Sequence, residues 1–321
     1  MSTEKKNIDP ASLGKVVLLA GGVSSEREVS LMSGKGVYDA LVDAGVDVTR
    51  FDPQDDDLSE LEKGQYDRAM IALHGRFGED GTIQGVLEYL GIPYTGPGVR
   101  TSAIAIDKVM TKRIWRIANI PVPNGMLVTK NSDMNFVIQQ LGRDLVVKPA
   151  HEGSSIGLSK LKDASAEELA QAVVKASNLD PQVLVEERVF GRELTVAILG
   201  GGENARALPI IEIVAPDGDY DYQNKYFTND VRYDCPADLP PDLAEEISRT
   251  CVKAYHALGG RGWSRIDLML TEDGRFMLLE MNTSPGMTAH SLVPLAAKAV
   301  GMSYQDLVLS VLSEAALDGK R

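Results

Sequence analysis

The chain has 321 residues, of which 44% are hydrophobic and 25% charged, so it can bury a large core and is expected to divide into two or three domains. Its formal net charge of -13 argues against general binding to nucleic acid or to an anionic membrane, because either would require a broad basic surface. The 2 cysteines are far apart and have no Cys or His at zinc-ligand spacing, which indicates neither a disulfide framework nor a zinc site.

Residues 1–15 are polar and lack the apolar core of a signal peptide. No later apolar run is long enough to span a bilayer. We therefore expect a cytoplasmic protein with a flexible N-terminal tail over residues 1–15.

The first hundred residues alternate between short apolar strands and helices. The predicted strands are 16–20, 48–51 and 69–73, and the predicted helices are 28–44 and 82–90. Strands that alternate with helices indicate a parallel sheet with crossover connections.

The character of the chain changes near Ile106, where a helix through Ala118 is stopped by two prolines. This change indicates a new domain. Its further predicted elements are a strand at 145–148, a Gly/Ser loop at 151–157, a helix at 166–177 and a strand at 183–187.

From Gly191 onward the pattern changes again. The expected elements are strands at 193–199 and 208–214, a long polar and aromatic loop at 216–234, a helix at 242–258, and one or two amphipathic helices covering the sheet over 292–317. A loop as long as 216–234 is usually functional or disordered.

A hairpin is predicted between the last two of these helical regions, because Asp273-Gly274 separates two alternating apolar runs. A two-residue turn pairs Glu272 with Arg275. Counting back from the turn places Asp267 opposite Glu280 and Arg265 opposite Asn282, all on one face of the sheet.

Two carboxylates about 5 Å apart repel by about 3 kcal/mol at an effective dielectric constant of about 20, so Asp267 and Glu280 need a compensating charge. Arg265 is one candidate. Two carboxylates and the Asn282 amide oxygen suit Mg²⁺ better, and Mg²⁺ usually accompanies the phosphates of a nucleotide. The alternative is a solvated sheet face with unrelated charges. The turn at 283–288 favours the metal, because it offers backbone N–H groups nearby.

Two glycine-rich turns follow predicted strands. The first, Gly21 to Glu26, lacks the G-x-G-x-x-G spacing of a dinucleotide fold, and Glu26 either binds a substrate ammonium or complements a helix dipole. The second follows Lys148 and is rich in small donors, as a polyphosphate loop requires, although it lacks the P-loop pattern and could be an ordinary surface loop.

The loop at 216–234 places aromatic residues on both sides of Lys225, so it is either a substrate lid or a packed surface loop. The four histidines lack metal-ligand spacing. His256 lies in a predicted helix and is assigned a structural role. His74 follows a strand at its carboxyl end, where sites in parallel sheets occur.

With these motifs in order, the chain closely resembles the D-alanine–D-alanine ligase family of the ATP-grasp superfamily over nearly all of 16–312. The motifs that carry the resemblance are Gly21 to Ser30, Ala72 to Gly75 with Gly78 to Thr82, Tyr94 to Gly96, Glu152 to Ser155, Tyr222 to Tyr226, and Asn282 to Met287.

The resemblance implies an α/β protein, α+β in its C-terminal part, with the ATP-grasp fold and three domains. These are a Rossmann-like substrate domain at 16–106, a central subdomain at 107–190, and a C-terminal subdomain at 191–321 with its lid loop at 216–234. It also implies a homodimer, with no nucleic-acid or membrane partner.

The implied reaction joins two D-alanines through a D-alanyl phosphate, with ATP as co-substrate and two Mg²⁺ or Mn²⁺ ions, for peptidoglycan precursors. ATP is expected between the central and C-terminal subdomains, and its implied contacts are Lys108 and Lys148 on the phosphates, Glu186 near the adenine, Glu193 on the ribose, and Ser155, Lys225 and Asn282. The implied metal ligands are Asp267, Glu280 and Asn282.

The first D-alanine is expected to place its ammonium near Glu26, with His74 also in the substrate site. The carboxylate of the second is expected at Ser291 and the Leu292 backbone. Arg265 and the Gly286 N–H match the groups that stabilise the tetrahedral oxyanion. Glu26, Ser154 and Tyr226 match a hydrogen-bonded trio that ties the lid to the site.

Tyr226 favours an amine as the second nucleophile, because ligases that form the D-lactate ester are expected to lack this tyrosine. Two places depart from the family pattern, Ala150-His151 and the acidic Glu187, and they concern only adenine contacts. The alternatives are another ATP-grasp ligase making D-Ala-D-Ser or D-Ala-D-lactate, and a catalytically silent nucleotide-binding regulator.

Overall fold

The computed structural model describes residues 8–216 and 231–319. Its first unit is a parallel three-stranded sheet in the order β2-β1-β3, as the alternating pattern predicted. The strands are β1 (Lys15–Leu19), β2 (Asp47–Phe51) and β3 (Arg68–Ile71), and the helices are α1 (Arg27–Asp43), α2 (Ser59–Lys63) and α3 (Thr82–Leu90). Apart from Lys15, the residues of β1 are fully buried, as expected for a strand covered on both faces.

The extent of the predicted tail, 1–15, is wrong. Pro10–Leu13 forms a 3₁₀ helix whose N-terminal Asp9 side chain accepts a hydrogen bond from the Ala11 N–H, and Lys15 already belongs to β1. Leu13 is buried in the core, so its burial anchors this segment.

The helix predicted from near Ile106 through Ala118 is α5 (Lys108–Ile117), and a helix that was not predicted, α4 (Val99–Ile106), precedes it. Asp107 separates them with an extended backbone, and its side chain accepts hydrogen bonds from the Val109 and Met110 N–H groups at the start of α5. This cap sets where α5 begins, next to the site described below.

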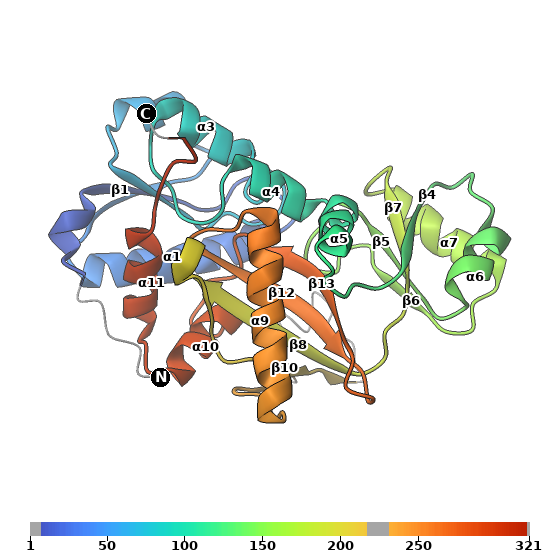
Figure 1. Cartoon of the computed structure of the whole chain (residues 1–321). Coiled ribbons are helices and arrows are strands. Elements are labelled where there is room, and N and C mark those ends of the chain that lie inside the picture. The colour runs from blue at the N-terminus through green and yellow to red at the C-terminus, as the bar shows by residue number, and fades with distance from the viewer. Residues whose placement is uncertain (1–7, 217–230, 320–321) are drawn as a thin grey trace.

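The central unit is an antiparallel four-stranded sheet in the order β4-β7-β5-β6. Its core consists of residues of these strands and of two helices that pack on one another. The elements are β4 (Gly125–Val128), β5 (Leu145–Pro149), β6 (Ser159–Leu161), β7 (Val183–Glu187), α6 (Met134–Leu141) and α7 (Ala166–Ser177). Figure 1 shows this unit at one end of the molecule, joined to the rest at α5.

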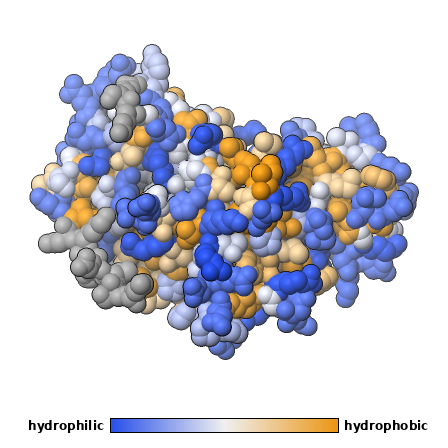
Figure 2. All heavy atoms as spheres, in the orientation of Figure 1, coloured by the Kyte–Doolittle hydropathy of each residue, from blue (hydrophilic) through white to orange (hydrophobic). Residues whose placement is uncertain are grey.

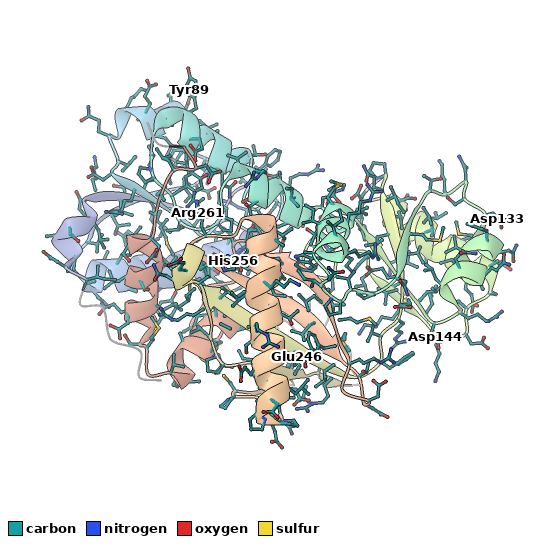
Figure 3. The ribbon with its side chains drawn as sticks, viewed as in Figure 1. Tyr89, Asp133, Asp144, Glu246, His256 and Arg261 are labelled. Carbon is teal, nitrogen blue, oxygen red and sulfur yellow. The ribbon has the colours of Figure 1, made fainter. Side chains whose placement is uncertain are left out.

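The third unit is a sheet in the order β11-β10-β8-β12-β13, with β9 paired to β8. Helix α9 (Pro241–Leu258) lies across it (Figure 1). The strands are β8 (Arg192–Leu199), β9 (Arg206–Ala207), β10 (Ile211–Val214), β11 (Arg232–Asp234), β12 (Trp263–Leu270) and β13 (Phe276–Asn282). His256 is exposed on α9 (Figure 3) and lies away from the cleft and the pocket described below.

Two predicted boundaries in this unit are wrong. The strand expected at 208–214 starts at Ile211, after the separate short strand β9, and the loop expected to run to residue 234 ends before β11. Lys225 and Tyr226, with the rest of 217–230, lie outside the described residues.

Helices α10 (Leu292–Ala299) and α11 (Tyr304–Ser313) complete the chain. One core cluster joins residues of β1 and α1 to residues of β8, β12, α10 and α11, so the first and third units share a core. Within the described part of the chain, none of the helices has both the length and the apolar composition needed to cross a membrane. Figure 2 shows hydrophilic residues across most of this face, with apolar residues in smaller groups.

Candidate active site

The hairpin of β12 and β13 places the predicted charged residues on one face. Arg265 pairs with Asn282 and Asp267 with Glu280, as the sequence predicted. The predicted turn is nevertheless wrong, because Thr271 and not Glu272 pairs with Arg275, and the Thr271 N–H donates to the Arg275 carbonyl at 2.8 Å.

The turn therefore has three residues, with Gly274 in the left-handed region at φ +82°. This shifts the register by one residue, so that Leu268 pairs with Leu278, and a bulge at Leu279 shifts it back before Glu280. Two unpredicted irregularities cancel, and Asp267 and Glu280 face each other as expected.

The structure shows which charges compensate the two carboxylates. Arg265 donates to both oxygens of Asp267, at 2.8 and 2.7 Å, and Asp267 also accepts from Asn282 Nδ2 at 3.1 Å. Glu280 lies 3.3 Å from the Lys108 ammonium. Each carboxylate thus has a cation of its own, and the Arg265 guanidinium is held in a fixed orientation by its bidentate contact.

A cleft of about 640 Å³ lies between the central sheet and the third sheet. Its size and mixed lining suit a ligand as large as a nucleotide. The predicted nucleotide and metal residues that line it are Lys108, Lys148, Ser155, Glu186, Glu193, Asp267 and Glu280.

Glu186 is buried in this cleft between two lysines. One of its oxygens contacts Lys112, and the other lies 2.7 Å from Lys148. Burial alone would raise the pKa of Glu186, but the two ammonium groups outweigh it and hold the pKa below the ordinary value. Lys112 was missed in the sequence, where its only signal is a position four residues after Lys108 and hence on the same side of α5.

A second, polar pocket of about 20 Å³ adjoins the cleft, because Glu280 lines both. It brings together predicted catalytic, substrate and metal residues from all three units. These are Glu26, His74, Ser154, Arg265, Asn282 and Gly286.

Glu26 contacts the Ser154 hydroxyl in this pocket, which brings together two of the three members of the predicted trio. A side chain on Gly75 or Gly153 would stand 2.7 or 2.9 Å from Glu26 Oε2, so glycine at both positions leaves room for the carboxylate. Tyr226, the third member, lies outside the described residues.

His74 is held on both sides by protein atoms. Its Nδ1 donates to the Ser284 carbonyl at 2.8 Å, so Nε2 accepts from the Ser33 hydroxyl at 3.0 Å. Burial lowers the pKa of His74, which keeps the ring neutral. Ser33 in turn accepts the Met287 N–H at 3.1 Å, so this network joins α1 to the turn at 283–288.

Glu79 was missed as a site residue, although it belongs to one of the family motifs. Its carboxylate accepts the N–H groups of Gly75 at 3.1 Å and Ser284 at 3.3 Å, inside the second pocket. Burial raises the pKa of Glu79 to about 8, and the nearby Glu26 carboxylate adds to the rise.

The turn at 283–288 carries the predicted oxyanion and carboxylate groups. Among the described residues the Gly286 N–H has no hydrogen-bond partner, and a side chain at Gly286 would stand 3.1 Å from the Ser291 hydroxyl. Ser291 and Leu292 begin α10. The Ser284 hydroxyl is also buried and unpaired within the described residues, so it is available to a bound substrate.

The departures from the family pattern have local partners. Glu187 accepts from the Asn124 backbone N–H at 3.0 Å and from its amide at 3.1 Å. His151 contacts Asp180 at 2.7 Å and lies 3.5 Å from Asp107, which links the loop at 151–157 to the start of α5.

The residues where the cleft meets the second pocket fit a metal ion that also coordinates the phosphates of a nucleotide. Within the described residues, no three His, Cys, Asp or Glu side chains converge to form a complete metal site. Asp267, Glu280 and the Asn282 amide supply hard oxygen ligands, and Mg²⁺ characteristically takes its remaining ligands from phosphates and water.

Two family models match the chain, one to part of the first unit and one to the central and third units together. The model described as D-ala D-ala ligase C-terminus matches residues 114–313, and that described as D-ala D-ala ligase N-terminus matches residues 46–97. The chain is 56% identical over 319 residues to the D-alanine–D-alanine ligase of Delftia acidovorans, which covers 99% of this chain and 97% of the relative. It is 55% identical over 312 residues to that of Cupriavidus metallidurans, with coverage of 97% and 95%.

Solved structures agree with this assignment. The D-alanine–D-alanine ligase of Bacillus anthracis matches with a TM-score of 0.81 and 34% identity, over 94% of this chain and 97% of the other. Its complex with ATP matches at 0.81 and 33% over the same shares. The VanG D-Ala:D-Ser ligase of Enterococcus faecalis matches at 0.79 and 27%, over 94% and 98%.

Proposed function

This chain belongs to the D-alanine–D-alanine ligase family, and we propose that its cleft and second pocket together join two D-alanine molecules at the expense of ATP. The observation that carries the proposal is the shared wall at Glu280. Glu280 lines both a cleft large enough for a nucleotide and a pocket that contains a carboxylate, a guanidinium and the Gly286 N–H, which has no partner among the described residues.

The cleft is the proposed ATP site. Lys108 and Lys148 bind the phosphates, because they are the ammonium groups that line it near Glu280. Glu186 and Glu193 contact the adenine and the ribose, and Ser155 lies on the phosphate loop. Lys225, in the predicted lid loop at 216–234, would be a further ATP contact.

The floor of the cleft is the proposed metal site. Asp267, Glu280 and Asn282 would hold two Mg²⁺ or Mn²⁺ ions with the nucleotide. A bound ion would neutralise the charge of the transferring phosphoryl group.

We expect Asp267→Asn and Glu280→Gln each to weaken metal–nucleotide binding by about tenfold or more, because each removes an anionic ligand. ATP titration at several Mg²⁺ concentrations measures the effect, and thermal unfolding checks that the fold is kept. An unaltered Mg²⁺ dependence in both variants would rule out the metal site.

The second pocket is the proposed amino-acid site. Glu26 would bind the ammonium of the first D-alanine, whose carboxylate takes the γ-phosphoryl group of ATP to give D-alanyl phosphate and ADP. Phosphorylation makes the carboxyl carbon electrophilic, and the closed contact of Glu26 with Ser154 keeps water from it.

Ser291 and the Leu292 backbone would hold the carboxylate of the second D-alanine. Its amine attacks the acyl phosphate, phosphate leaves, and the peptide bond forms. Arg265 and the Gly286 N–H, which line this pocket, would stabilise the oxyanion of the tetrahedral intermediate, and the loss of one such donor costs about 3 to 4 kcal/mol.

Phosphate release tests the proposal. We expect release with ATP, Mg²⁺ and D-alanine together and none when D-alanine is omitted. Folded protein that releases no phosphate would instead favour the catalytically silent nucleotide-binding regulator. The intact set of Arg265, Asp267 and Gly286 supports the enzyme.

The match to a D-Ala:D-Ser ligase makes the second substrate a separate question. Relatives more than 50% identical carry the D-alanine–D-alanine name, which supports D-alanine. Competition among D-alanine, D-serine and D-lactate as second substrate, read by mass of the product, tests this. Homodimerisation and a cytoplasmic location belong to the same proposal, and sedimentation of the purified protein measures the former.

A further inference from the structure

Helix α5 carries a second buried lysine, Lys112, one turn after Lys108. Lys108 pairs with Glu280, and Lys112 pairs with Glu186. The Lys112 side chain is only 2% exposed, and it is absent from the described residues that line the cleft, whereas Lys148 and Glu186 line it. Lys112 therefore lies behind Glu186 and does not reach the space proposed for the nucleotide.

The two oxygens of Glu186 are each held by a different lysine. Oε1 contacts Lys112, and Oε2 lies 2.7 Å from Lys148. Two lysine side chains thus contact one buried carboxylate, each through a different oxygen. Lys148 is the member that faces the cleft.

We propose that Lys112 is a positioning residue, the partner that stays on Glu186 when Lys148 turns to the phosphates of ATP. The inference rests on the proposed nucleotide site. Without Lys112, Lys148 would be the only ion-pair partner of Glu186 among the described residues, and its movement to a phosphate would leave that carboxylate unpaired. An unpaired buried charge is strongly unfavourable. With Lys112 in place, Glu186 keeps a hydrogen-bonded lysine partner throughout.

The electrostatics of the three groups agree with this division of roles. Burial lowers the pKa of Lys112 to about 7, Glu186 opposes the shift, and repulsion from Lys148 adds to it. Burial also acts to lower the pKa of Lys148, but Glu186 and Glu280 outweigh it and raise that pKa. When Lys148 turns toward a phosphate, its repulsion of Lys112 decreases, and the pair of Lys112 with Glu186 strengthens.

Calorimetric titration of the full chain in a double-mutant cycle tests the proposal. Lys112→Met should weaken ATP binding by about tenfold or more, since Lys148 is then retained by Glu186. In a Glu186→Gln background the same change should cost about threefold or less, because a neutral amide does not retain Lys148. Equal losses in the two backgrounds would overturn the proposal.

The affinity for adenosine distinguishes a positioning role of Lys112 from a purely structural one. Adenosine offers Lys148 no phosphate, so Lys112→Met should change its affinity by about threefold or less, and a loss as large as that for ATP would contradict the role. Lys112→Arg keeps the charge and should retain ATP affinity. Lys15→Met, a lysine replacement on β1, is the matched control for general destabilisation and should leave ATP affinity unchanged.

Lys148→Met distinguishes failure of this inference from failure of the nucleotide assignment. Unchanged ATP affinity in Lys148→Met would overturn both. A loss in Lys148→Met with equal losses for Lys112→Met in both backgrounds would overturn only the role of Lys112. If Lys112→Met does not fold, Lys112→Gln, which can still hydrogen-bond Glu186, is measured with the same expectations.

Discussion

Ser33 connects helix α1 to the turn that carries Gly286. Its hydroxyl donates to His74 and accepts the Met287 N–H, and Ser33 is fully buried. Replacement by alanine leaves both partners buried without a hydrogen bond. We therefore expect Ser33→Ala to lower the free energy of unfolding by about 1 to 3 kcal/mol and to reduce kcat, because the turn loses a restraint.

Ser264→Ala is the matched control. Ser264 is also fully buried, but its hydroxyl has no partner among the described residues, so its removal should leave stability and kcat nearly unchanged. Chemical denaturation and steady-state kinetics measure both variants. Equal effects of the two substitutions would show that the Ser33 network has no special role.

The raised pKa of Glu79 predicts that the free energy of unfolding depends on pH. The pKa is about 8 in the folded protein, against 4.5 as its ordinary value. Between these values the folded state holds a proton that the unfolded state has lost, so stability falls as pH rises from about 4.5 to about 8, by at most about 1.4 kcal/mol per pH unit.

Glu79→Gln removes this proton equilibrium. The stability of the variant relative to the native protein should therefore rise steadily from pH 5 to pH 8. Urea denaturation across that range measures the difference, and a difference that stays constant with pH would contradict the assigned pKa.

The sequence could identify those residues whose neighbours make a motif. Glu26, Asp267 and Gly286 all fall within short patterns that imply a site. Lys112 and Ser33 lie inside helices, where a lysine or serine is common and its burial depends on the packing of distant elements. Their roles follow only from three-dimensional contacts with Glu186 and His74.

In the hairpin of β12 and β13, the strands and their charged pair were predicted correctly although the predicted turn was wrong. Alternating apolar residues predicted both strands and the pairing of Asp267 with Glu280. They could not predict a three-residue turn or the bulge at Leu279, because both depend on local backbone geometry. Two shifts of one residue cancelled, whereas either one alone would have moved Glu280 out of register.

Helix α5 presents both Lys108 and Lys112, so its N-terminal cap is expected to matter for ATP binding. Asp107→Ala removes the hydrogen bonds to Val109 and Met110 and should cost about 1 kcal/mol of stability, with weaker ATP binding. Asp107→Asn keeps a capping side chain and should retain most of the stability.

Asp133→Ala provides the control, because Asp133 caps α6 in the same way, well away from the cleft residues on α5 (Figure 3). It should lower stability by a similar amount and leave ATP affinity unchanged. Calorimetry and thermal unfolding compare the variants. A loss of ATP affinity in Asp133→Ala as large as in Asp107→Ala would argue against a specific role for α5.

At the scale of the whole molecule, the hydrophobic cores do not follow the order of the three units along the chain. The first and third units share one core, while β4 to β7 with α6 and α7 have their own. Leu307→Ala on α11 should cost about 2 to 5 kcal/mol and reduce hydrogen-exchange protection in both β1 and β8.

Val185→Ala should reduce protection mainly in β4 to β7, because Val185 packs in the separate central core. Mass spectrometry of hydrogen exchange resolves these segments. If Val185→Ala lowered protection of β1 as much as Leu307→Ala does, the cores would not be independent.

The shared core also sets an order in which the protein can fold during synthesis. β1 is among the first segments made, yet the residues that complete its core, on α11, are among the last. The central unit can fold as soon as residue 187 has left the ribosome, because its core contains no later residue. The pocket around Glu26 and Arg265 is therefore completed only late in synthesis, whereas the central sheet, which forms one wall of the cleft, can fold earlier.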